Sequence, residues 1–159
     1  PVLAFYSLIA EKHLSMLDEL ETELVEALEK DIVLLGRSKR SAAMVASIVE
    51  SYFTCAETVF VRISQFFENN LSENRWHKDL LEKMTLQIPE IRPSVLSDRV
   101  YVDLEELLRF RHFKRYYFNL SYDWERLDEI IKRAKRVHLP LSSELRAFIQ
   151  FLASLPAAG

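Results

Sequence analysis

Two arginines one helical turn apart, Arg111 and Arg115, are the residues best suited to chemistry in this 159-residue chain. Guanidinium groups donate hydrogen bonds in a planar fork that fits phosphate oxygens, and residues four apart share a helix face. Lys114 adds a third cation beside them. The spacing therefore favours binding of a phosphodiester by Arg111, Lys114 and Arg115.

Arg111 also stands where an aliphatic side chain is expected. Leu104, Leu107 and Leu108 mark an apolar stripe at helical spacing, and Arg111 continues that stripe. A guanidinium on a core-facing stripe is costly unless it is paired, so its presence favours a functional role. The competing interpretation is a solvated basic helix end that pairs with Glu105 or Glu106.

The histidines and the cysteine are weaker candidates. His112 follows Arg111 directly and so points about 100° away from it around the helix. His77 is predicted to make a partly buried contact, and His13 and His138 are predicted to lie at the surface. Cys55 is predicted to fill the core. Since no two histidines have the spacing of metal ligands and no glycine-rich loop occurs, neither a metal nor a cofactor is predicted.

Composition limits the class of protein. The chain is 49% hydrophobic and 28% charged, which is typical of one globular domain over residues 1–159. A net charge of −3 argues against coating nucleic acid by charge alone. A single cysteine, the lack of a secretory signal pattern and the lack of an apolar run of membrane length predict a cytoplasmic protein with no membrane contact.

Helical periodicity predicts an all-α chain, an up-and-down antiparallel bundle of four core helices with shorter helices added. The first helix is predicted over about Val2–Lys30, followed by a turn over Asp31–Gly36 in which Gly36 is the helix-ending residue. Ser38 is the predicted cap of a second helix that reaches about Asn70. Aromatic residues crowd this second helix and suit a core or a dimer face: Tyr52, Phe53, Phe60, Phe66 and Phe67.

The second half is predicted as four more helices whose ends are set by capping residues and prolines. These are a helix over Glu73–Leu86 capped by Ser72, an extended connection at Pro89 and Pro93, a helix from Ser97 or Asp98 to about Phe118, a turn over Asn119–Tyr122, a helix from Asp123 to about Val137, a break at Pro140, and a last helix over Ser142–Leu155.

The segment 107–127, LLRFRHFKRYYFNLSYDWERL, resembles the motif region of HepT-like proteins, which belong to the HEPN class of helical proteins. The family pattern there is FRH, two variable residues, Arg, His, one residue, Tyr and then DWERL. Two further segments look like the family's WHxxLLxxM and IRPPVLS segments, namely 76–84 and 91–97, and the segment 144–148 looks like its closing helix. The likeness covers most of the chain from about residue 40.

The resemblance implies a helical toxin of a bacterial or archaeal toxin–antitoxin pair. Such toxins dimerise through the motif helices and cleave RNA without a metal. The motif arginine, matched by Arg111, would steady the charge on the scissile phosphate, and the motif histidine would move protons. The antitoxin would be a nucleotidyltransferase, which in some pairs adenylylates a motif tyrosine of the toxin.

The chain departs from the motif at two positions. Tyr116 stands where the family has its histidine, and Phe118 stands where it has its tyrosine, with Tyr117 adjacent. A phenol with a pKa of about 10 is a poor base at neutral pH. His112 from a second copy of the helix is an alternative base across a dimer interface. The candidate catalytic residues are thus Arg111, His112 and Tyr116, and the candidate modification sites are Tyr116 and Tyr117.

Three hypotheses follow. The leading one is a HepT-like toxin that forms a homodimer or larger homo-oligomer, pairs with a nucleotidyltransferase and is a metal-independent endoribonuclease with a degenerate motif. The second is a non-catalytic interaction or dimerisation module, in which an acidic side chain neutralises Arg111. The third, least favoured, is a nucleotide-sensing domain.

Overall fold

The computed structural model describes residues 2–68, 76–116 and 123–156. Within these ranges the chain is all-α, as predicted, and no strand is formed. The elements in order are α1 (Val2–Glu26), the π-helical turn η1 (Ala27–Asp31), α2 (Ile32–Leu35), α3 (Lys39–Phe67), α4 (Trp76–Thr85), α5 (Asp98–Tyr116) and α6 (Trp124–Ser154).

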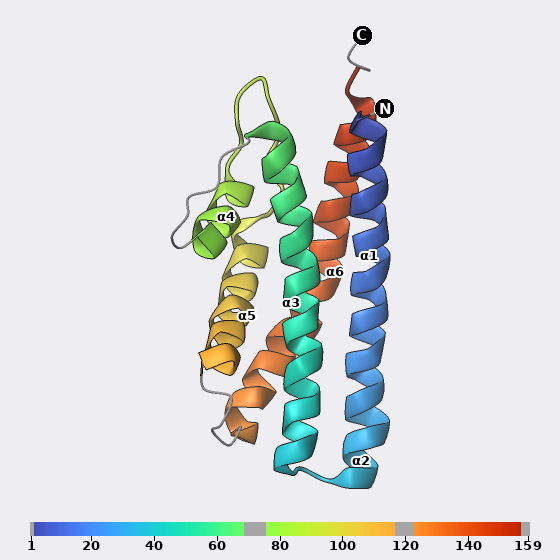
Figure 1. Cartoon of the computed structure of the whole chain (residues 1–159), viewed down its shortest axis with the longest axis vertical. Helices are drawn as coiled ribbons and strands as arrows, with labels where there is room; N and C mark the ends of the chain where they lie inside the picture. Colours follow the sequence, from blue (N-terminus) through green and yellow to red (C-terminus); the bar gives the residue numbers. More distant parts are fainter. Residues whose placement is uncertain (1, 69–75, 117–122, 157–159) are drawn as a thin grey trace.

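The long helices α1, α3 and α6 lie side by side, and the shorter α4 and α5 cover the other flank of α3 (Figure 1). α5 packs against both α3 and α6, so its inner face is enclosed by two helices. The beginning of α1 and the end of α6 lie at the same end of the bundle (Figure 1). This arrangement confirms the predicted helical bundle.

The first helical segment is longer than the sequence pattern predicts. The predicted turn over Asp31–Gly36 is wrong, because helical backbone continues through η1 and α2 to Leu35. The π-helical turn inserts one residue into the helical ladder, and Gly36, with φ of +73°, ends the helix. Gly36 was correctly predicted as the helix-ending residue.

Ser38 caps α3 as predicted. Its hydroxyl accepts a hydrogen bond from the amide of Ser41, and the Ser41 hydroxyl accepts one from the amide of Ser38. This reciprocal pair satisfies two amides that the first helical turn cannot satisfy. The predicted end at Asn70 lies outside the described residues, where α3 is followed only as far as Glu68.

The connection between α4 and α5 is organised by one buried arginine. Ile88 and Arg92 form an isolated antiparallel bridge around Glu90, whose φ is +62°. The Arg92 guanidinium is ion-paired with Glu68 and also donates to the carbonyls of Lys83, Leu86 and Pro93. The predicted extended connection is thus a compact loop held to the end of α3. The predicted cap Ser72 lies outside the described residues.

α6 runs unbroken through Pro140, so the predicted break and the predicted separate helix over Ser142–Leu155 are wrong. Proline removes one helical hydrogen bond and usually bends the helix. Figure 1 shows α6 changing direction along its length. The helix persists because Val137, Leu141 and Leu145 keep one buried stripe across the proline. Asp123 caps this helix as predicted, through its side chain and the amide of Glu125.

The core is centred on α3. Its rings Tyr52, Phe53 and Phe60 are fully buried, whereas Phe66 and Phe67 are half-buried. Among the described helices, α3 is the one that is long and apolar enough to cross a membrane by length and composition, with a mean hydropathy of 1.3. Most of its apolar window is buried by the other helices, as in the central helix of a bundle.

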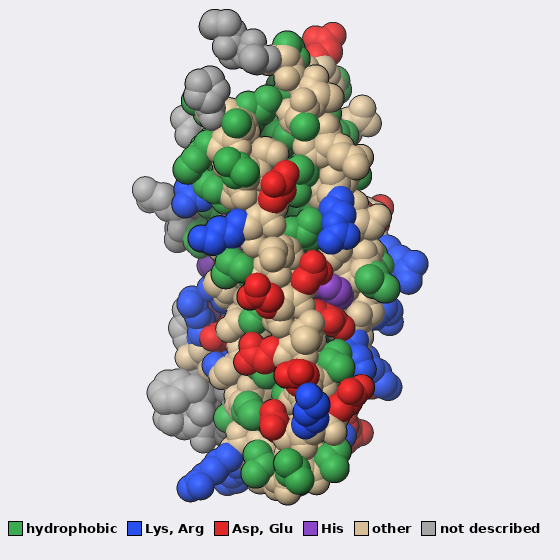
Figure 2. Space-filling model, turned by 90° about the vertical axis from the view of Figure 1, so that its right-hand side faces the viewer, with side chains coloured by type: hydrophobic (Ala, Val, Ile, Leu, Met, Phe, Trp, Pro, Cys, Tyr) green, Lys and Arg blue, Asp and Glu red, His purple; other side chains and the backbone are tan. Residues whose placement is uncertain are grey.

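The outer face of α1 carries acidic residues. Figure 2 shows acidic side chains gathered over the middle of this face, with apolar side chains at both ends. Apolar residues are exposed at the start of α1 and in α2, and they are Val2, Phe5, Leu8, Val33, Leu34 and Leu35.

Candidate functional site

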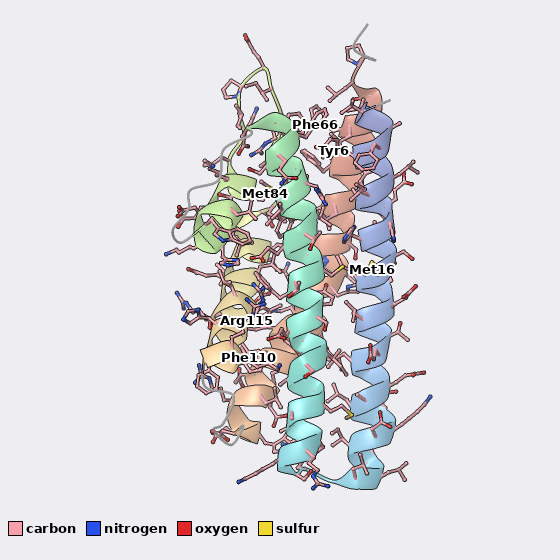
Figure 3. The ribbon with its side chains drawn as sticks, in the orientation of Figure 1. Tyr6, Met16, Phe66, Met84, Phe110 and Arg115 are labelled. Carbon is pink, nitrogen blue, oxygen red and sulfur yellow. The ribbon has the colours of Figure 1, made fainter. Side chains whose placement is uncertain are left out.

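The helix α5 places Arg111 in the interior, as the stripe predicts. Leu104 and Leu107 are fully buried on the same face, and Arg111 is only 7% exposed. Figure 3 shows Phe110 and Arg115 on the same helix. Phe110 is also buried, so apolar packing surrounds the stem of the arginine. The guanidinium therefore sits in a low-dielectric site, where it needs a partner.

That partner is Glu57 of α3. Arg111 Nη1 lies 3.2 Å from Glu57 Oε1, and both side chains are more than nine-tenths buried. The guanidinium carbon also lies 5.8 Å from the centre of the Phe53 ring. Arg111 Nε is buried and has no hydrogen-bond acceptor among the described residues. The arginine is thus neutralised, but its donors are not all used.

Glu57 also holds a histidine. His77 Nδ1, at the beginning of α4, lies 2.6 Å from Glu57 Oε2. The His77 ring stacks on Trp76, with ring centres 3.6 Å apart and planes inclined by 30°. The predicted partly buried contact of His77 is confirmed, since its side chain is 33% exposed. One buried carboxylate therefore joins a guanidinium and an imidazole from two different helices.

The prediction from sequence missed Glu57 as part of this site. A signal was present: Glu57 follows Phe53 by four residues and precedes Phe60 by three, so it lies on the apolar face of α3. A buried acid on one stripe is the natural counterpart of a buried arginine on another. His77 was weighed from the sequence only as a packing residue, because its carboxylate lies 20 residues away.

The other predicted phosphate-binding residues, Lys114 and Arg115, and the predicted catalytic residue His112 do not join the Arg111–Glu57 pair. Lys114 Nζ lies 3.5 Å from Glu50 Oε1, and His112 is exposed on α5. Arg115 is exposed and lines a groove of about 520 Å³ between α1 and α3. Glu19, Glu23 and Glu50 also line this groove, so its charge disfavours a phosphate.

The two candidate modification sites cannot be placed. Tyr116 is the last residue of α5, but its side chain lies outside the described part of the chain, and Tyr117 lies outside it altogether. Among the described residues, no group of three His, Cys, Asp or Glu side chains could hold a metal ion.

The segments behind the sequence resemblance meet in space. The guanidinium of Arg126, at the start of α6, lies 4.4 Å from the centre of the Phe113 ring on α5. A family model described as HepT-like protein matches residues 44–152 of the chain. The chain belongs to the HepT-like family. No curated protein and no solved structure matches it.

The matched range places the site within the family's domain. It extends from within α3 to near the end of α6 and includes Glu57, His77 and Arg111, whereas α1, η1 and α2 precede it. The HepT-like chain is thus a HEPN-type, toxin-like helical domain.

A second polar cluster in the HepT-like chain, partly buried, links three helices. The Tyr52 hydroxyl lies 2.9 Å from His138 Nδ1, and His138 Nε2 lies 3.0 Å from Asp18 Oδ1. The predicted surface position of His138 is wrong, because α6 continues through Pro140 and turns this residue inward. Burial raises the pKa of Tyr52 above its ordinary range, so the phenol stays neutral and is suited to structure.

Cys55 of the HepT-like chain is predicted to be a poor nucleophile. Burial raises the pKa of its thiol from 9.0 to about 11, and Sγ lies 3.4 Å from the His13 carbonyl. At neutral pH the thiolate fraction should be about 100-fold below that of an exposed cysteine. Alkylation by iodoacetamide, followed by mass spectrometry, should be slow in the native protein and fast in urea.

The raised pKa of the Cys55 thiol also predicts in which direction stability changes with pH. Since the folded thiol holds its proton more tightly than the unfolded one, stability should fall as pH rises from 9 to 11. A Cys55→Ala variant should not show this part of the loss of stability at alkaline pH. Equal alkylation rates for native and unfolded protein would contradict the burial argument.

Proposed function

We propose that this HepT-like chain is the toxin-side member of a toxin–antitoxin pair and a metal-independent endoribonuclease. In this proposal Arg111 binds the scissile phosphate, and a nucleotidyltransferase is the antitoxin. The observation that supports it is Arg111 itself, buried on an apolar stripe with Nε unsatisfied. A stability role alone would be served better by an aliphatic residue there.

Glu57 is compatible with this role. A phosphate that reaches the edge of Arg111 would replace Glu57 as acceptor and would use the forked donors of the guanidinium. Glu57 would keep His77 as its second partner, so no carboxylate would be left unpaired. The carboxylate thus holds the arginine in one orientation before RNA arrives.

A homodimer is part of the same proposal. Arg111 is 7% exposed within one chain, so little of its guanidinium is open to a phosphate there. In the proposed dimer the motif helices of two copies would meet near Arg111, as the family resemblance implies, and the second copy would complete the phosphate site. Val102 and Arg109 are exposed on the opposite side of α5 from Arg111, so neither belongs to this contact.

The test is cleavage of a labelled single-stranded RNA in EDTA by the wild type and by Arg111→Ala. Removing one preorganised donor from a charged transition state costs about 10²–10³-fold in rate. Arg109→Ala is the matched control, because Arg109 lies on the same helix but pairs with Glu105 and Glu106 at the surface. It should cleave as the wild type does.

Circular dichroism must show that Arg111→Ala is folded, and Arg111→Lys is a second variant that keeps the charge but loses the fork. Equal, background-level products from wild type and variants would end the ribonuclease proposal.

A non-catalytic interaction module is the second candidate function. The observation that favours it is the Arg111–Glu57 pair, in which an acid from the same chain neutralises the arginine. Capture of a nucleotidyltransferase by a protein that leaves RNA intact would favour the module over the enzyme.

A further inference from the structure

We propose that His77 is the catalytic base that accepts the 2′-hydroxyl proton, in place of the histidine for which this chain has Tyr116. Glu57 is its positioning residue. This inference rests on the proposed ribonuclease function and assigns the proton transfer that Arg111 cannot perform.

The hydrogen bond to Glu57 prepares His77 for this role. Nδ1 lies 2.6 Å from a carboxylate oxygen that is almost fully buried, so Nδ1 carries the hydrogen and Nε2 can accept a proton. The carboxylate also stabilises the imidazolium that forms, as in other carboxylate–histidine pairs of enzymes. A histidine held only for packing would not need an ionised acceptor in the interior.

The backbone and the neighbouring ring fix His77 in place. α4 is anchored by Leu80, Leu81 and Met84, which are fully buried. Stacking on Trp76 restricts rotation of the imidazole. Since one third of the side chain is exposed, His77 can meet a substrate that Glu57 cannot reach.

The base and the phosphate-binding cation share one carboxylate. His77 uses Oε2 of Glu57, and Arg111 uses Oε1. Both groups are therefore held at one spot by a single side chain of α3. His112, by contrast, is adjacent to Arg111 in sequence and points about 100° away around the helix.

The reaction balances without a metal or a redox partner. His77 Nε2 takes the proton of the 2′-hydroxyl, and the 2′-oxygen forms a bond to phosphorus. The bond from phosphorus to the 5′-oxygen breaks, and the 5′-oxygen takes a proton from water. The imidazolium returns its proton to the solvent, leaving a 2′,3′-cyclic phosphate and a 5′-hydroxyl end. Arg111 stabilises the negative charge that develops on the non-bridging phosphate oxygens in the transition state.

The experiment compares RNA cleavage by the wild type, His77→Ala and His77→Gln. We expect a loss of about 10²–10⁴-fold in both variants, because general-base catalysis is removed. Gln retains a side chain able to donate to Glu57 but cannot take the proton. Added imidazole should restore part of the activity of His77→Ala, since the vacated space lies against Trp76.

His13→Ala is the matched control. His13 is also half-buried, and its Nδ1 lies 2.8 Å from a backbone carbonyl, that of Ile9, on α1. This variant should cleave as the wild type does, and imidazole should not change its rate. RNA with a 2′-O-methyl group at every position should resist the wild type.

The outcomes separate the two proposals. If the wild type cleaves RNA and folded His77→Gln cleaves equally well, His77 is not the base, although the ribonuclease function stands. Loss of activity in folded His77→Ala without rescue by imidazole would likewise reduce His77 to a structural role. If the wild type cleaves nothing, the proposed function fails and this inference fails with it.

Discussion

Replacing Arg92 with methionine is expected to lower the free energy of unfolding by about 3–5 kcal/mol. The Arg92 side chain is fully buried and donates to Glu68 and to three backbone carbonyls, those of Lys83, Leu86 and Pro93. Methionine fills a similar volume but leaves the Glu68 carboxylate without its cation and removes one donor from each of the three carbonyls, although Ser64 Oγ still donates to Glu68 and the Leu86 amide to Lys83. Urea denaturation followed by circular dichroism measures the loss.

Two further variants show whether stability depends on the forked geometry of the Arg92 guanidinium or only on its positive charge. Arg92→Lys keeps the charge but cannot donate in four directions from one plane, so most of the loss should remain. Arg109→Met is the exposed control, since the Arg109 side chain is 61% exposed and pairs with Glu105 and Glu106 at the surface, and it should change stability by less than about 1 kcal/mol. Equal effects of the Arg92 and Arg109 variants would show that Arg92 does not organise the loop.

Glu57→Gln is expected to destabilise the protein more than Arg111→Met does. In Glu57→Gln the buried guanidinium loses its counter-charge, which costs about 3–5 kcal/mol. In Arg111→Met the carboxylate keeps His77 as a partner, so the cost is smaller. The double variant should recover stability relative to Glu57→Gln alone, because no buried charge is left unpaired. A double-mutant cycle in urea measures the coupling.

The double variant also separates stability from function. It should fold and yet fail to cleave RNA, because a residue kept for chemistry can be replaced without loss of stability. Glu129→Gln is a control for the loss of an acid, since the pair of Glu129 with Lys132 is exposed on α6. If Glu57→Gln is as stable as the wild type, Glu57 is not needed to neutralise the buried Arg111 guanidinium.

Local chemistry explains which helix ends could be predicted. Gly36, Ser38 and Asp123 mark real boundaries, because left-handed backbone and side-chain capping act within a few residues. The predicted helix break at Pro140 is wrong because a proline destabilises a helix only locally. The buried stripe through Leu141 outweighs that local cost, and it depends on packing against other helices. The extension of α1 through η1 has the same origin, since a π-helical turn has no sequence signature of its own.

Only half of the candidate site could be predicted from the sequence. The apolar stripe of α5 was enough to bury Arg111, and charge balance required an acid to meet it. Which acid could not be chosen, because Glu57 precedes Arg111 by 54 residues and the packing of α3 on α5 decides the match. Lys114 and Arg115 were grouped with Arg111 by spacing alone, yet they turn toward Glu50 and an acidic groove.

The continuity of α6 has a consequence for biosynthesis. This helix follows the other described helices in the sequence, yet it covers both α1 and α5 and carries the arginines that bind the buried Asp103. Until α6 has been synthesised, an apolar flank of α3 stays exposed to solvent, and α3 resembles a membrane span in composition. Premature termination within α6 should therefore yield chains that aggregate or recruit chaperones, and not a smaller folded bundle.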